Sequence, residues 1–105
     1  MAVLYGSTRG NGEKITASMA ILKGLAEDGG LFVPDSIPAL DVPLKELLGK
    51  SYQEIAYQVM SRLLTDFTEE ELRNCINKAY DSKFDTPEIA PLVKKGNSYY
   101  LELFH

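Results

Sequence analysis

Two segments in the middle of the chain carry apolar residues at the three- and four-residue spacing typical of a helix that packs through one face. The apolar residues of the first segment are Tyr52, Ile55, Ala56, Val59, Met60, Leu63 and Leu64, and those of the second are Leu72, Cys75, Ile76, Ala79 and Tyr80. Each segment begins with a pair of residues that fits a capping box, namely Ser51 with Glu54 and Thr68 with Glu71. The pattern therefore predicts two helices whose apolar faces point into a core.

A third helix is predicted over residues 17–26, where Thr16 can cap the first turn. Its apolar stripe consists of Ile21, Leu22 and Leu25. Gly24 would lie inside this helix, at a cost of about 1 kcal/mol relative to alanine. The sequence Asp28-Gly29-Gly30 then ends the helix, because glycine readily adopts the left-handed conformation found after helix C-termini. A short helical turn is predicted over residues 44–48, which follow a proline.

Both ends of the chain have extended patterns instead. Residues 2–8 are predicted as a short strand, residues 31–34 as a short extended segment, and residues 92–94 and 99–104 as the two strands of a hairpin. The predicted fold class is therefore α+β, a small, mostly helical domain with three main helices and short helical turns. Its small sheet is expected to come from the N-terminal strand and the C-terminal hairpin, with the first strand pairing near the last.

The last strand has apolar residues on both faces, which predicts burial on both sides. It ends at Leu103-Phe104-His105, whereas chain termini are usually polar and an apolar edge strand invites association with other chains. Two interpretations are open. Residues 1–105 are a single domain excised from a larger chain, or this is a natural C-terminal strand that the domain itself buries.

Composition narrows the classes of function. The chain has 105 residues, of which 11 are basic and 15 acidic, so its formal net charge of −4 argues against a nucleic-acid-binding domain. One cysteine, Cys75, and one histidine, His105, exclude a disulfide framework and a metal site built from several such ligands. No apolar segment approaches the roughly 20 residues of a membrane span, and no basic segment precedes an apolar core in the pattern that predicts a signal peptide. We therefore expect a cytoplasmic protein with neither a membrane nor a nucleic acid as partner.

The best candidate for binding chemistry is the segment Ser7, Thr8 and Arg9. Its hydroxyls, its guanidinium and the glycines that follow suit a phosphate or carboxylate group. The segment lacks the spacing of a P-loop or a dinucleotide fingerprint, so the alternative is an ordinary turn with an exposed arginine. Cys75 lies on an apolar helical stripe and is expected in the core rather than as a nucleophile. The residues by themselves thus predict no metal site and no self-sufficient catalytic site.

Three blocks of the sequence resemble threonine synthases. Residues 5–10, YGSTRG, resemble the Y-x-S-T-R-G opening of these enzymes. Residues 20–34, AILKGLAEDGGLFVP, are similar to the family's stretch A-I-L-x-G-L-A-x-D-G-G-L-[FY]-V-P. Residues 101–105, LELFH, resemble the L-E-L-F-H that leads into the family's active-site segment. The blocks occur in the family's order, so the resemblance covers essentially the whole chain.

The resemblance implies the N-terminal domain of a pyridoxal-phosphate enzyme that converts O-phospho-L-homoserine and water to L-threonine and phosphate. In this family L-E-L-F-H continues into G-P-T-x-A-F-K-D, whose lysine forms the Schiff base with the cofactor, and the present sequence stops at His105, before that lysine. The resemblance therefore favours the excised-domain interpretation. It implies that residues 1–105 are inactive alone and bind no cofactor, and that their partner is the remainder of the parent chain with its cofactor-binding domains.

Several alternatives stay open within this resemblance. The domain is either mainly structural, which we favour, or it brings Ser7, Thr8 and Arg9 to the phosphate of the substrate, since a guanidinium binds a phosphate through paired hydrogen bonds. Threonine-synthase-like proteins share this N-terminal region and can act as phospholyases on related phosphorylated amino acids. The last alternative is a free-standing, acidic, helical binding module.

Overall fold

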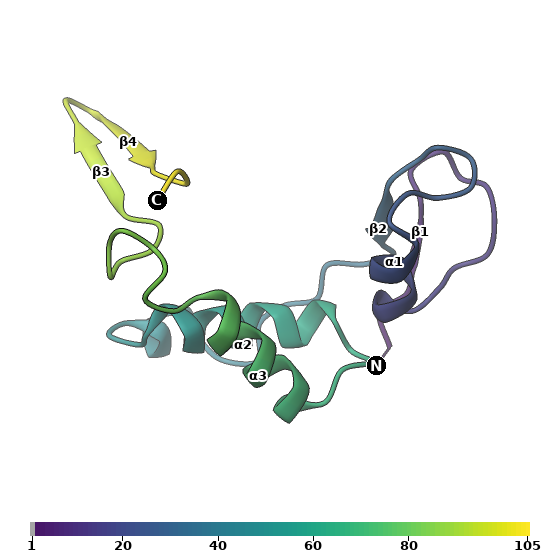
Figure 1. Ribbon diagram of the computed structural model, residues 1–105, viewed down its shortest axis with the longest axis horizontal. Coiled ribbons are helices and arrows are strands. Elements are labelled where there is room, and N and C mark those ends of the chain that lie inside the picture. The colour runs from purple at the N-terminus through teal and green to yellow at the C-terminus, as the bar shows by residue number, and fades with distance from the viewer. Residues whose placement is uncertain (1) are drawn as a thin grey trace.

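The computed structural model describes residues 2–105, which form three regions in chain order (Figure 1). We call residues 2–35 the N-terminal lobe and residues 91–105 the C-terminal arm, and a pair of helices lies between them. The described elements confirm the α+β class, with three α-helices and two separate two-stranded antiparallel sheets. The two sheets lie at opposite ends of the molecule (Figure 1).

The sheet of the N-terminal lobe is formed by β1 (Tyr5–Ser7) and β2 (Phe32–Pro34), which run antiparallel. At the other edge of β1, Tyr5 exchanges two backbone hydrogen bonds with Ile15. The expectation that the first strand pairs near the last strand was therefore wrong. Partners much closer in sequence occupy both edges of β1, and closing the shorter loops costs less conformational entropy.

Helix α1 (Ala17–Lys23) begins at Thr16, whose side chain caps the first turn as predicted. The helix ends at Gly24, with φ of 76°, so the prediction that it continues to residue 26 through an interior glycine was wrong. A left-handed glycine stops the helix one turn early. The helix buries Ala17 and Ala20. The predicted stripe is instead exposed, by 62% at Ile21, 79% at Leu22 and 62% at Leu25.

A 3-10 helix (Leu44–Leu47) lies within the predicted helical turn and leads to α2 (Tyr52–Leu63) and α3 (Glu69–Ala79). These two α-helices pack against each other in the middle of the molecule (Figure 1). The end of α2 also anchors the N-terminal lobe. The Tyr5 hydroxyl donates a hydrogen bond of 2.8 Å to the carbonyl of Leu63, at the end of α2.

The two predicted capping boxes have different outcomes. At Thr68 both halves are present, because its side chain accepts from the Glu71 N–H and the Glu71 carboxylate accepts from the Thr68 N–H. Ser51 caps α2 by accepting from the Glu54 N–H. The Glu54 carboxylate makes no reciprocal bond with Ser51 in the described structure, because it binds Arg73 of α3 instead. The second half of that capping box was thus a wrong prediction.

The buried core is small and divided. The buried apolar residues are Val3, Ala17, Ala20, Ala26, Leu72, Ile76 and Ile89. Helix α3 contributes Leu72 and Ile76 as predicted, but α2 buries no residue fully and Cys75 is exposed. The prediction of a buried Cys75 was therefore wrong, whereas α2 does face α3, with side chains that are only half-buried. The two helices pack against each other, and no further helix or sheet of the described residues packs on their remaining apolar side chains.

The C-terminal arm is the predicted hairpin, with β3 (Leu92–Lys95) paired antiparallel to β4 (Ser98–Leu101). Gly96, with φ of 60°, forms the turn. The last strand ends at residue 101 rather than at 104. Its predicted burial on both sides was wrong as well, because no residue of β4 is buried and Tyr99, for example, is 62% exposed.

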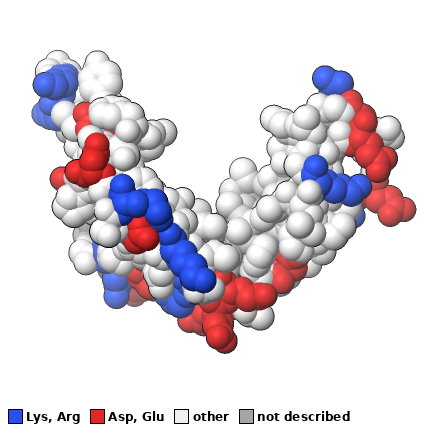
Figure 2. All heavy atoms as spheres, viewed as in Figure 1, with Lys and Arg blue, Asp and Glu red and all other residues white. Residues whose placement is uncertain are grey.

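The overall shape is open. The radius of gyration is 16.2 Å, against about 13 Å for a compact chain of this length. The solvent-accessible surface is 7728 Å², against about 5,900 Å² for a compact protein of this mass. Figure 2 shows that Lys, Arg, Asp and Glu lie mainly on the outer surface in this view, while the hollow between the two ends carries few charges. The surface is thus larger than that of a compact protein, and the concave face in this view carries few charges.

Candidate functional site

The predicted binding segment, residues 7–9, packs directly against residues 28–30, and we call these six residues the polar knot. The Ser7 hydroxyl donates a hydrogen bond of 2.6 Å to Oδ1 of Asp28. The same carboxylate oxygen accepts from the Gly30 N–H at 2.9 Å. One carboxylate therefore holds the end of β1 against the loop that leads into β2.

Thr8 and Arg9 make the other contacts of the polar knot. The Thr8 hydroxyl oxygen accepts from the Leu31 N–H at 3.0 Å, and the Thr8 N–H donates to the Leu31 carbonyl at 2.8 Å. Nη1 of Arg9 donates to the backbone carbonyl of Asp28 at 2.8 Å. All three predicted site residues thus have partners within the lobe itself.

The glycines of the polar knot are required by space. A Cβ at Gly30 would lie 2.2 Å from Oγ of Ser7 and 3.1 Å from the backbone nitrogen of Arg9. Gly29 adopts a φ of 83°, and a Cβ there would lie 2.9 Å from Nη1 of Arg9. Gly29 and Gly30 therefore do more than end a helix, which is the role predicted for them, because they let two loops approach closely.

The electrostatics of the polar knot keep Asp28 ionised. The hydrogen bond from Ser7 lowers the pKa of the Asp28 carboxyl, and the N–H groups of Gly30 and Asn11 and the charge of Arg9 act in the same direction. A carboxylate that accepts several hydrogen bonds favours its charged form. The negative charge of Asp28 already offsets the positive charge that Arg9 would offer to an anion.

A hollow of about 280 Å³ opens beside the polar knot and includes Asp28 in its lining. Lys23 and Glu27, which also line it, form an ion pair of 3.4 Å. Glu13 adds a further carboxylate. A mixture of three carboxylates with one paired lysine does not resemble a site selective for a phosphate dianion.

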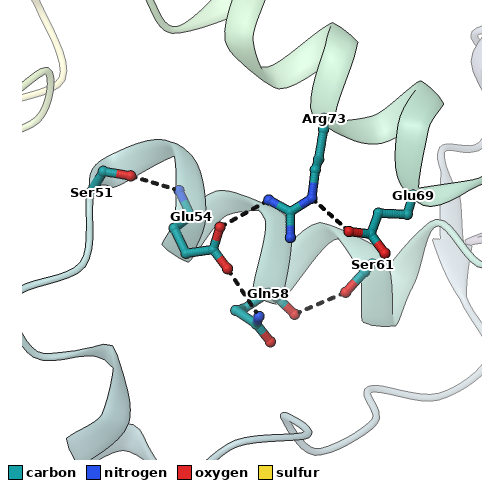
Figure 3. Close-up of polar contacts among 6 residues, drawn as sticks. All are labelled: Ser51, Glu54, Gln58, Ser61, Glu69 and Arg73. Carbon is teal, nitrogen blue, oxygen red and sulfur yellow. Dashed lines mark hydrogen bonds and ion pairs between the residues drawn. The ribbon is translucent and has the colours of Figure 1, made fainter.

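A second polar cluster joins the two central helices (Figure 3). Arg73 of α3 donates to Glu54 of α2 at 2.9 Å and to Glu69 of its own helix at 2.8 Å. Its guanidinium carbon also lies 3.8 Å from the centre of the Tyr57 ring. The bond from Arg73 lowers the pKa of Glu54, and the bond from Gln58 adds to this effect. All the polar partners are charged or amide groups of the same helical pair, which indicates a clamp between α2 and α3.

The remaining candidates show no catalytic arrangement. Cys75 is exposed, and His105 lies in the C-terminal arm against Asp85 and Glu102. Over residues 2–105 no three histidine, cysteine or acidic side chains gather as metal ligands. No helix in this described range has the length and apolar character that crossing a bilayer requires.

Sequence reasoning found residues 7–9 but missed their partner. Asp28 was interpreted only as part of a helix stop, although an Asp two residues before a Gly commonly binds nearby backbone N–H groups. The bridge made by Arg73 was also missed. The spacing of Glu69 and Arg73, four residues apart on one helix, does predict the ion pair between these two residues. It does not predict the second bond, from Arg73 to Glu54 of the other helix.

Comparisons with known proteins identify the family. The family model "Threonine synthase N terminus" matches residues 4–80. Threonine synthase of Schizosaccharomyces pombe is 41% identical over 98% of this chain, which covers 21% of that protein. Human threonine synthase-like 1 is 39% identical over 89% of this chain, which covers 14% of it.

A solved structure has the same fold. The crystal structure of PLP-bound threonine synthase from Brucella melitensis superposes with a TM-score of 0.85 and 34% identity, over 99% of this chain and 23% of that one. The open arrangement of lobe, helices and arm therefore recurs within a larger protein. The chain spans about a fifth of the length of the threonine synthases it matches. With a family model that covers most of its length and relatives of this identity, the chain belongs to the threonine synthase N-terminal family.

Proposed function

We propose that this chain is the N-terminal domain of a cytoplasmic threonine synthase, which converts O-phospho-L-homoserine and water to L-threonine and phosphate with pyridoxal phosphate. The observation that carries the proposal is the match to the Brucella melitensis enzyme over 99% of this chain at 34% identity. That enzyme is PLP-bound, and this chain corresponds to 23% of it. The reaction then belongs to the complete protein, of which residues 1–105 are one domain.

The role proposed for the domain itself is structural. Its surface exceeds that of a compact protein of this mass by roughly 1,900 Å², more than the roughly 800 Å² that each partner buries in an ordinary stable interface. This surface includes exposed apolar side chains of the C-terminal arm, such as Leu103 at 78% and Phe104 at 76%. We expect the remainder of the parent chain, with its cofactor-binding domains, to cover these residues.

The residues of this chain do not fit a cofactor pocket. Bound pyridoxal phosphate supplies an electron sink for carbanion chemistry, and it requires a lysine to anchor it. Lys14 and Lys23 are largely exposed and paired with Asp35 and Glu27. No polar or charged side chain in residues 2–105 is buried. We therefore expect the anchoring lysine and the cofactor's phosphate site to lie in the rest of the parent protein.

The polar knot is proposed to organise the lobe rather than to hold the substrate's phosphate. Ser7, Thr8 and Arg9 bond to Asp28 and Leu31, and Asp28 offsets the arginine charge. In the complete enzyme, Arg9→Ala should leave KM and kcat within about twofold, and Arg9→Lys should behave alike. A rise in KM of tenfold or more in Arg9→Ala, with recovery in Arg9→Lys, would show instead that this charge contacts the substrate.

A second candidate function has a specific observation in its favour. Identity to human threonine synthase-like 1, at 39%, is close to the 41% found for Schizosaccharomyces pombe threonine synthase. The parent protein would then be a phospholyase acting on a related phosphorylated amino acid. Product analysis separates the two, since the synthase converts O-phospho-L-homoserine to threonine whereas the phospholyase would release phosphate without forming threonine.

The decisive first experiment reads the codons that follow His105 in the source gene and assays the complete protein. An encoded G-P-T-x-A-F-K-D, followed by formation of threonine from O-phospho-L-homoserine, would support the proposal. A stop codon directly after His105 would contradict it and leave the free-standing acidic binding module as the better explanation.

A further inference from the structure

The imidazole of His105 lies between two carboxylates that come from different segments. Its Nδ1 is 2.6 Å from Oδ1 of Asp85, in the loop that follows α3. Its Nε2 is 2.9 Å from Oε1 of Glu102, three residues earlier in the arm. The His105 side chain is only 18% exposed, although Asp85 is open to solvent. Both ring nitrogens are therefore committed to acidic partners at once.

This geometry determines the protonation state. Ionised carboxylates only accept hydrogen bonds, and a neutral imidazole has one donor and one acceptor nitrogen. In the neutral form one of the two contacts would bring a nitrogen lone pair against a carboxylate oxygen. In the imidazolium form both contacts are charge-assisted hydrogen bonds. The two short distances at His105 therefore favour the doubly protonated ring.

The clamp lies where the chain has little other support. Strand β4 ends at Leu101, and the Glu102 N–H donates to the carbonyl of Pro91 at 3.0 Å. Within the described structure, residues 103–105 make no backbone hydrogen bond to another segment. The two bonds of the His105 ring thus fix the direction in which these residues leave the arm.

We propose that His105 is a positioning residue, held as an imidazolium between Asp85 and Glu102. It fixes the path of the chain from this domain toward the cofactor-binding domains of the parent protein, which we call the catalytic body. The inference rests on the proposed function, because it places further chain after this residue. The clamp itself is a property of the described residues and can be tested without activity.

The clamp depends on pH in a defined direction. The bond to Glu102 raises the pKa of His105, and the bond and charge of Asp85 add to this effect. Among the described residues, Asp85 and Glu102 are the charged groups that bond to the ring. A raised pKa means that the stabilisation is complete below the ordinary value of 6.5 and is lost as pH rises through the higher native value.

The first test follows the imidazole of His105 in the complete protein by nitrogen-detected NMR, with the signal assigned by its loss in His105→Gln. Both ring nitrogens should be protonated at neutral pH, and the midpoint should lie above that of an ordinary histidine. Asp85→Asn should lower this midpoint, whereas Glu88→Gln, which removes a carboxylate from the same loop, should leave it unchanged. An ordinary midpoint that does not respond to Asp85→Asn would overturn the clamp.

A second measurement tests the positioning role. In the active enzyme kcat/KM should fall by about tenfold as pH rises through the midpoint measured for His105, because the following segment loses its alignment. Asp85→Asn should move this fall to lower pH together with the NMR midpoint, and Glu88→Gln should not. If Asp85→Asn shifts the NMR midpoint but leaves the pH dependence of kcat/KM unchanged, the positioning role is overturned. Failure of the proposed function itself would appear separately, as a protein without threonine formation whose His105 still titrates as expected.

Discussion

The N-terminal lobe and the C-terminal arm both contain a two-stranded antiparallel sheet, yet only the lobe has fully buried residues. In the lobe Val3, Ala17 and Ala20 are buried, although the apolar stripe of α1 stays exposed. In the arm no layer of the described structure covers the hairpin, and Tyr99 and Leu101 are 62% and 58% exposed. A two-stranded hairpin is marginally stable alone, which supports the proposal that the rest of the parent protein covers the arm.

The two regions also differ in what holds them. In the lobe, the Asp28 carboxylate accepts hydrogen bonds from the Ser7 hydroxyl and the Gly30 N–H. An apolar side chain at position 28 would leave both donors without this acceptor. The arm has apolar side chains in excess, and its only described side-chain clamp is His105 between Asp85 and Glu102. Substitutions in the lobe should therefore act locally, whereas those in the arm should act through the rest of the protein.

The largest effect is expected from Phe104→Ala in the complete protein. Phe104 is 76% exposed here, and if the catalytic body covers it, truncation leaves a cavity and costs about 4 kcal/mol of stability. Phe104→Leu is the matched control, because it keeps an apolar side chain and should cost about 1 kcal/mol. Denaturant unfolding of the three proteins measures both changes. Equal and small losses in both variants would mean that the arm stays uncovered.

A somewhat smaller effect is expected from Gly30→Ala. The new Cβ would lie 2.2 Å from Oγ of Ser7, so the polar knot must open at a cost of about 3 kcal/mol. The Thr8 N–H donates to the Leu31 carbonyl and the Leu31 N–H donates to the Thr8 hydroxyl, so hydrogen exchange of both amides should accelerate by about a hundredfold. Amides of β3 and β4 should keep their rates, because the arm shares no hydrogen bond with this loop.

Gly6→Ala is the matched control for Gly30→Ala. Gly6 lies in β1, has an ordinary φ, and a Cβ there would meet only the flexible side chain of Lys14, at 3.7 Å. Its effect on the same amides should be slight. Similar acceleration in both alanine variants would show that loss of glycine in general, rather than the close approach at Gly30, weakens the lobe.

The sequence predicted what is local and missed what depends on distant partners. The caps at Thr16, Ser51 and Thr68 follow from residues three positions apart, and all three form. The family blocks likewise indicated the family that the comparisons then showed. Local rules thus sufficed for where helices begin and for which family the chain belongs to.

The failures share a physical cause. Apolar residues at Leu22 and Tyr99 satisfy every pattern rule for burial, but a pattern cannot say whether the covering layer belongs to the same segment of chain. Similarly, Asp28 looked like a helix stop because its partner Ser7 lies 21 residues away. In the sequence, the close approach of two loops is indicated only by the glycines that permit it. A glycine such as Gly24, which ends a helix, cannot be told from Gly30 on that basis.

The smallest effect, and the sharpest test of the contrast, concerns the charge of Asp28. Its pKa is lowered by the hydrogen bond from Ser7 and the other donors of the polar knot. A lowered pKa contributes stability that is present above the ordinary value of 3.8 and is lost as pH falls through the lower native value. Exchange at the Thr8 and Leu31 amides, corrected for intrinsic rates, should therefore rise a few-fold in that acidic window.

Asp28→Asn removes this titration while keeping an acceptor for Ser7. The variant should show somewhat faster exchange at neutral pH, because the amide replaces the oxygen that accepts from the Asn11 N–H, and little further change on acidification. Amides of the C-terminal arm report on general acid effects in the same sample. If the lobe of Asp28→Asn responded to acid as strongly as the wild type, the ionised carboxylate would not be what holds it. The lobe would then rest on apolar contacts, as the arm is proposed to do in the complete protein.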